Sequence, residues 1–135
     1  MTTASPAIAI TSQPVPAADR PGETGALIAG SRWTSSGGGP TVITYSFATS
    51  SADYSPATPF STSASPLSEA DRQTTREVLH NIEAVCNVQF VEVADTAASH
   101  GVIRYAYSQT PNAMGYAGYA FYPSAVEPGG DVWLG

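Results

Sequence analysis

A helix-type segment between two strand-type segments is the feature that most constrains this fold. Residues 41–47 alternate larger and smaller side chains, which predicts a strand whose larger residues face a core. Residues 68–86 carry apolar residues at helical spacing, and residues 88–93 predict a second strand. Two strands joined through a helix are expected to run parallel, with a right-handed crossover. This order predicts an α/β fold.

The expected helix begins at a capping signal, because Ser68 and Asp71 resemble a capping box with Asp in place of the preferred Glu. Its apolar positions form one stripe, which we expect to face the sheet. The stripe consists of Ala70, Thr74, Val78, Ile82 and Val85, with Leu79 and Cys86 beside it. The charged residues are expected mainly on the opposite side: Glu69, Arg72, Arg76 and Glu83.

The C-terminal third predicts three more strands. Residues 102–107 form the first, and the aromatic-rich residues 116–122 form the second. Pro123 and Pro128 cannot donate to a ladder, so a loop is expected before the last strand at residues 131–134. The expected architecture is a twisted, mostly parallel sheet of about five strands, with an antiparallel edge strand and one main helix.

Residues 1–24 differ in composition from the rest of the chain. They consist largely of Ala, Pro, Thr and Ser, and offer little to pack. We predict a disordered leader or a pro-segment there, followed by a single domain at residues 25–135.

The charge of the chain excludes some partners. The net charge is −6, and the sequence contains no lysine. Such a chain is poorly suited to nucleic acid or to an anionic membrane surface, and no apolar run approaches the roughly 20 residues that span a bilayer. Cys86 is the only cysteine, so no intrachain disulfide can form. We expect a monomer.

The sequence predicts no catalytic residues and no metal ligands. Its two histidines, His80 and His100, have no partner at a ligand-type spacing, and Cys86 is six positions from His80. The acidic residues are scattered, and no Gly-x-Ser-x-Gly motif is present.

An ordered set of segments nevertheless resembles the serralysin-like branch of the metzincin zinc endopeptidases. The resemblance covers roughly residues 26–135 and includes the segments 30–33, 43–47, 67–72, 119–123 and 129–133. It implies that residues 25–135 are the N-terminal part of a catalytic domain with a metzincin-like upper subdomain. It also implies a secreted metalloendopeptidase, a hydrolase of peptide bonds, although no N-terminal signal peptide is visible.

The family's zinc-binding helix carries His-Glu-x-x-His-x-x-Gly-x-x-His, and this motif is absent from the chain. The resemblance therefore implies zinc in the full-length family, with ligands that are not in this chain, and the possibility of calcium. The chain as given is expected to be inactive. The positions that hold structural zinc in related matrix enzymes correspond to Tyr119 and Trp133, so no structural zinc is expected.

What the resemblance does transfer to this chain is the binding of an extended peptide or protein substrate. By motif match, the substrate-binding positions on the edge strand are Ala117, Gly118, Tyr119 and Ala120. Two alternatives stay open: a non-catalytic module that binds peptides with this strand, and a truncated gene product that does not fold stably.

Overall fold

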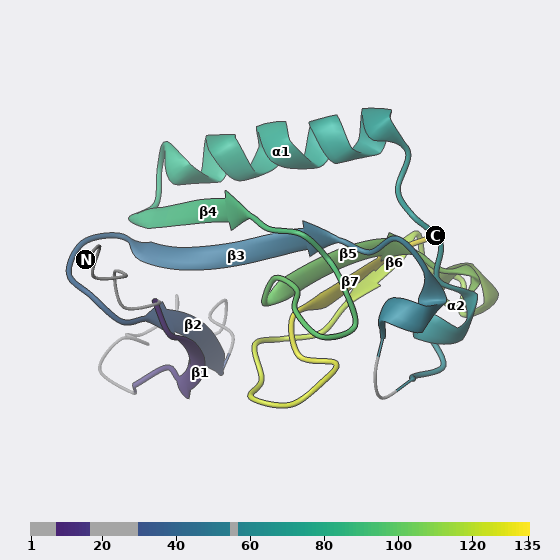
Figure 1. Ribbon diagram of the computed structural model, residues 1–135, viewed down its shortest axis with the longest axis horizontal. Coiled ribbons are helices and arrows are strands. Elements are labelled where there is room, and N and C mark those ends of the chain that lie inside the picture. The colour runs from purple at the N-terminus through teal and green to yellow at the C-terminus, as the bar shows by residue number, and fades with distance from the viewer. Residues whose placement is uncertain (1–7, 17–29, 55–56) are drawn as a thin grey trace, which may run out of the picture.

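The computed structural model describes residues 8–16, 30–54 and 57–135. Its main sheet has five strands in the order β4-β3-β5-β7-β6 (Figure 1). The strands are β3 (Thr41–Phe47), β4 (Val88–Glu92), β5 (Ile103–Tyr107), β6 (Gly118–Ala120) and β7 (Asp131–Leu134). All neighbouring pairs are parallel except β6 and β7. The predicted α/β class, the mostly parallel five-stranded sheet and its antiparallel edge strand are confirmed.

The main helix, α1 (Glu69–Glu83), lies along one face of the sheet (Figure 1). Ser68 caps it, because its side chain accepts a hydrogen bond from the backbone N–H of Asp71. The longer connections contain only short helical turns. These turns are η3 (Ser51–Asp53), η4 (Ser61–Ser63) and α2 (Gln109–Ala113).

The predicted sheet-facing stripe of α1 is wrong. Val78, Ile82 and Val85 are 52%, 37% and 84% exposed, and Leu79 is the only buried residue of the helix. The positions turned toward the sheet include Arg72 and Arg76 instead. Their guanidinium groups lie 5.6 Å and 5.2 Å from the centroid of the Phe47 ring.

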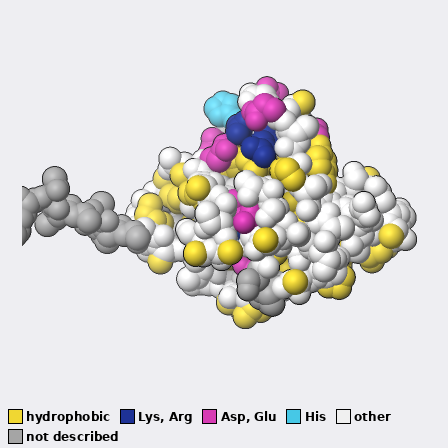
Figure 2. All heavy atoms as spheres, turned by 45° about the vertical axis from the view of Figure 1, so that its right-hand side comes forward, with side chains coloured by type: hydrophobic (Ala, Val, Ile, Leu, Met, Phe, Trp, Pro, Cys, Tyr) yellow, Lys and Arg dark blue, Asp and Glu magenta, His cyan; other side chains and the backbone are white. Residues whose placement is uncertain are grey.

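Arginine can occupy this face because its aliphatic stem packs on apolar surface while its guanidinium group stacks on an aromatic ring. Arg76 also pairs with Glu69 at 3.0 Å and with Glu92 at 2.7 Å. Figure 2 shows the basic side chains of the visible face gathered at the top of the molecule among acidic ones. Apolar periodicity alone could not indicate this arrangement.

The predicted leader contains a strand. β1 (Ile10–Pro14) pairs antiparallel with β2 (Ser31–Ser35) in a separate two-stranded sheet (Figure 1). Residues 10–14 are thus ordered where disorder was expected, because the backbone of β2 offers them a ladder. The other leader residues from 1–7 and 17–24 lie outside the described residues, and the pro-segment role stays a prediction.

Two apolar clusters cover the two faces of the main sheet. Tyr45, Phe47, Leu67 and Leu79 form the cluster beneath α1. The cluster on the opposite face consists of Ala48, Tyr54, Ala106 and Trp133, with Phe60, Ala64 and Phe121 packed against it. In the described part of the chain, no helix is long and apolar enough to cross a membrane.

Candidate functional site at the outer edge of β6

The structure places the four predicted substrate-binding residues at the edge of the main sheet. β6 pairs only with β7, and all three of its residues are exposed, as is Ala117 before it. The residues are contiguous, so they present one uninterrupted stretch of backbone. The expectation of an antiparallel edge strand is confirmed for Gly118, Tyr119 and Ala120, and Ala117 lies immediately before the strand. Peptide binding there stays a prediction.

Alternate residues of β6 direct their backbone groups away from the sheet. The carbonyl of Ala117 accepts a hydrogen bond from Gly135, and the N–H of Phe121 donates to Asp131. Residues 117, 119 and 121 therefore face β7. In an antiparallel ladder, the intervening residues point their groups to the other side. Gly118 and Ala120 thus offer N–H and C=O groups to an incoming strand, with no described partner outside the ladder.

Gly118 is needed for the close approach of β6 to β7. A Cβ atom added to it would lie 3.0 Å from the backbone oxygen of Trp133. A larger residue would press on β7, so the glycine lets the two strands keep their spacing. Because glycine has no side chain, no side-chain atoms rise above the backbone of Gly118 on the sheet face that carries α1.

An aromatic stack supports the opposite side of the edge. The Tyr119 ring stacks on Phe60, with centroids 4.9 Å apart, and Phe60 lies 6.2 Å from Trp133. Trp133 is completely buried and contacts Tyr54 at 4.6 Å. The stack connects an exposed ring to the core, so it fixes the position of the edge strand.

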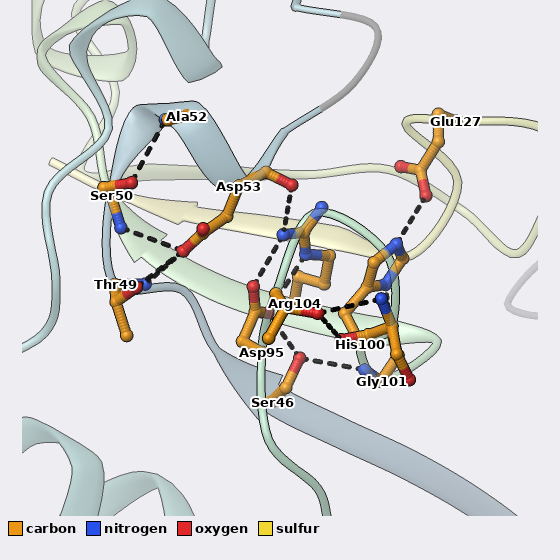
Figure 3. Close-up of polar contacts among 12 residues, drawn as sticks. Ser46, Thr49, Ser50, Ala52, Asp53, Asp95, His100, Gly101, Arg104 and Glu127 are labelled. Carbon is orange, nitrogen blue, oxygen red and sulfur yellow. Dashed lines mark hydrogen bonds and ion pairs between the residues drawn. The ribbon is translucent and has the colours of Figure 1, made fainter.

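A buried ion pair holds the sheet next to this stack (Figure 3). Arg104 donates to Asp95 through Nη2 at 2.6 Å, and the two side chains are 2% and 0% exposed. Arg104 also donates to the backbone carbonyl of Asp53 at 2.9 Å and lies 4.0 Å from the Tyr54 ring centroid. Ser46 donates to Asp95 at 2.6 Å. The single positive charge is thus already matched by one carboxylate.

Asp131 brings a second carboxyl group to the same place. Asp131 lies opposite Arg104 in the register of the parallel strands β5 and β7. It is 2% exposed, and its side chain receives no hydrogen bond from a described residue. Burial first, and then the negative charge of Glu127, raise the pKa of Asp131 to about 7. Asp131, the first residue of β7, is therefore a carboxyl group that titrates close to neutral pH.

The contribution of Asp131 to the free energy of unfolding is expected to decrease as the pH rises from about 4 to about 8. The unfolded chain releases this proton near pH 3.9, whereas the folded protein keeps it up to a pKa of about 7. A raised pKa stabilises the fold fully below the unfolded value, and this contribution is lost above the folded value. Asp131→Asn should therefore raise the free energy of unfolding by on the order of 4 kcal/mol at pH 8 and change it little at pH 4.

Urea unfolding at both pH values measures this effect. Glu77→Gln on the exposed face of α1 makes the same chemical change away from the buried pair, and as a surface substitution it should change the free energy of unfolding by no more than about 0.5 kcal/mol. Equal gains for Asp131→Asn at both pH values would contradict the assignment.

The described residues do not assemble a metal site. In residues 8–16, 30–54 and 57–135, no three His, Cys, Asp or Glu side chains lie together in a way that could hold a metal ion. His80 Nδ1 lies 3.5 Å from Glu83 on α1, and His100 pairs with Glu127 on a different loop. The donor set therefore does not fit a zinc centre, and no catalytic step is assigned to these residues.

Sequence reasoning missed the support behind the edge. The Phe60–Tyr119 stack joins positions far apart in the chain, and the Arg104–Asp95 pair spans a nine-residue interval that carries no recognisable motif. No protein-family model matches the chain, and no curated protein matches it either.

Proposed function

We propose that this chain binds extended peptide segments along the outer edge of β6. The observation that carries this proposal is the row of outward backbone groups at Gly118 and Ala120, which are exposed at the edge and have no hydrogen-bond partner among the described residues. An extended peptide adds to such an edge as a further strand, held mainly by main-chain hydrogen bonds. The flanking aromatic rings supply apolar contact area for its side chains.

The resemblance to serralysin-like metzincins supports a particular setting for this activity. In that setting, the chain is the substrate-holding part of a secreted zinc endopeptidase with a metzincin-like fold, and residues outside these 135 supply the zinc ligands. The second candidate is a binding module without catalysis. The same edge strand serves both functions, and they differ in whether a bound peptide is cleaved.

Zinc content and casein digestion test whether these 135 residues carry zinc chemistry of their own. For the isolated chain we expect no stoichiometric zinc and no digestion, because the donor set of the described residues does not fit a zinc centre. One tightly held zinc together with proteolysis would contradict this expectation and assign the chemistry to these residues.

Backbone NMR tests the binding itself. Addition of an unlabelled eight-residue peptide rich in Val and Thr should shift the amide resonances of Gly118 and Ala120 more than that of Tyr119, which faces β7. Ala120→Pro removes one outward N–H while sparing the ladder, since proline is tolerated on an edge strand. We expect it to weaken binding by up to about tenfold, which corresponds to the loss of one hydrogen bond.

The peptide provides a matched control. Methylation of backbone nitrogens at alternate positions should abolish binding for the set that faces β6 and leave the other set nearly unaffected. Unchanged resonances at residues 117–120, or equal loss for both methylated sets, would refute strand addition.

A further inference from the structure

A cavity separate from the β6 edge lies between the small two-stranded sheet and two loops of the main sheet. Its volume is about 350 Å³. Three segments line it: β1 with residues 10–12, the end of the β4–β5 loop with residues 100–102, and the β6–β7 loop with residues 124–127 and 129. Trp33 of β2 completes the wall. This volume lies at the small end of the range for ligand sites, about 300–1,000 Å³.

The walls of the cavity are closely packed. Gly130 has φ of 87°, and a Cβ atom there would collide with the backbone of Val102 and lie 2.9 Å from the Trp33 ring. A Cβ atom on Gly129 would lie 2.5 Å from Ser124. The two consecutive glycines let the β6–β7 loop lie directly against Val102 and Trp33. These contacts hold the walls in place, so the cavity is formed before any ligand binds.

The charged groups of the cavity come from two opposite loops (Figure 3). His100 Nε2 lies 3.3 Å from Glu127 Oε1, while Nδ1 lies 2.8 Å from the carbonyl oxygen of Gly101. The imidazole thus holds one carboxylate oxygen of Glu127. The other oxygen, Oε2, has no hydrogen-bond partner among the described residues. The Glu127 side chain is 29% exposed and therefore partly desolvated.

The other residues that line the cavity favour a ligand of positive charge. Among the described residues, neither lysine nor arginine lines the cavity, and the lining histidine, His100, already lies against Glu127, so an anion would meet a carboxylate there. A cation would gain a charge-assisted hydrogen bond from Oε2 and lie beside an indole ring, the aromatic group that attracts cations best. The chain's net charge of −6 also favours a cation over an anion. Ile10, Val102 and Val126 add apolar wall for the body of the molecule.

We infer that this cavity binds a small organic cation, a primary ammonium group on an apolar or aromatic body, with Glu127 as its counter-ion and Trp33 as its aromatic wall. The site is independent of strand addition at β6. It gives the chain a second ligand class, small amines, in addition to extended peptides.

Three probes of the same shape and different charge test the inference on the unmodified chain. They are 2-phenylethylamine, 2-phenylethanol and phenylacetate. The readout is the indole N–H resonance of Trp33, and the buried indole of Trp133 serves as an internal reference. The amine should shift the Trp33 resonance and bind at least about tenfold more tightly than the alcohol, as expected for one charge-assisted hydrogen bond. Phenylacetate should bind most weakly.

Variants locate the counter-ion. Glu127→Gln should remove the preference for the amine over the alcohol, whereas Glu77→Gln, an equal change of charge on the exposed face of α1, should preserve it. Equal affinity for the three probes, no shift at Trp33, or an unchanged preference in Glu127→Gln would overturn the inference. The comparison of probes on the unmodified chain holds even if Glu127→Gln fails to fold.

Discussion

Trp133→Ala is expected to lower the free energy of unfolding by about 3–5 kcal/mol, the cost of removing a large buried aromatic side chain. Trp133 is completely buried and contacts both Tyr54 and Phe60. Its removal leaves a cavity beneath the aromatic stack that ends at Tyr119. Because β6 rests on this stack, the substitution should also weaken peptide binding at the edge. Guanidinium unfolding and the peptide titration measure the two effects.

Two further substitutions serve as controls for this prediction. Trp133→Phe keeps an aromatic ring in place and loses only part of the buried ring system, together with an indole N–H that has no hydrogen-bond partner among the described residues, so it should cost less than Trp133→Ala. Tyr122→Ala removes an aromatic ring that is 74% exposed, and should change stability by no more than about 0.5 kcal/mol. A Tyr122→Ala effect as large as that of Trp133→Ala would disprove the proposed role of burial.

Arg104→Met should cost about 3–5 kcal/mol at pH 8, because it leaves Asp95 as a buried charge without its partner. The Asp131 carboxyl group adds to the penalty at this pH, since it loses its nearest cation as well. The cost should be smaller at pH 5, where Asp131, with a pKa of about 7, is protonated. Thermal unfolding at the two pH values measures the difference.

Arg76→Met is the matched control for this second prediction. Arg76 also forms ion pairs with carboxylates, but its side chain is 30% exposed and its partners Glu69 and Glu92 are 77% and 39% exposed. Exposed pairs of this kind contribute about 1 kcal/mol or less. Equal losses for the two arginine variants would show that burial does not decide the energy of these pairs.

The order of the main elements could be predicted from local signals. The strand at residues 41–47 and the last strand at residues 131–134 have the predicted bounds, and the helix cap at Ser68 is where its motif places it. These features depend on side-chain alternation, proline and capping residues within a few positions. The edge position of residues 117–120 also follows, although it rested on the family resemblance.

The helix face and the leader strand were mispredicted for a common reason. Val78 and Val85 are exposed because the side of α1 that faces the sheet carries Arg72 and Arg76. These two arginines pack over Phe47, which belongs to strand β3. Ile10–Pro14 forms a strand because β2 pairs with it. In both cases the deciding partner lies elsewhere in the chain, where no periodicity within the segment registers it.

The sequence by itself determined the α/β class, the number of main strands and their order along the chain, and the absence of a familiar catalytic motif. Each of these depends on residues close together in the chain. Only the tertiary structure decided which face of α1 is buried, that Arg104, Asp95 and Asp131 share one buried site, and that His100 meets Glu127 at a cavity. The physical reason is that these energies come from desolvation and from contacts between distant segments, which arise only when the chain has folded.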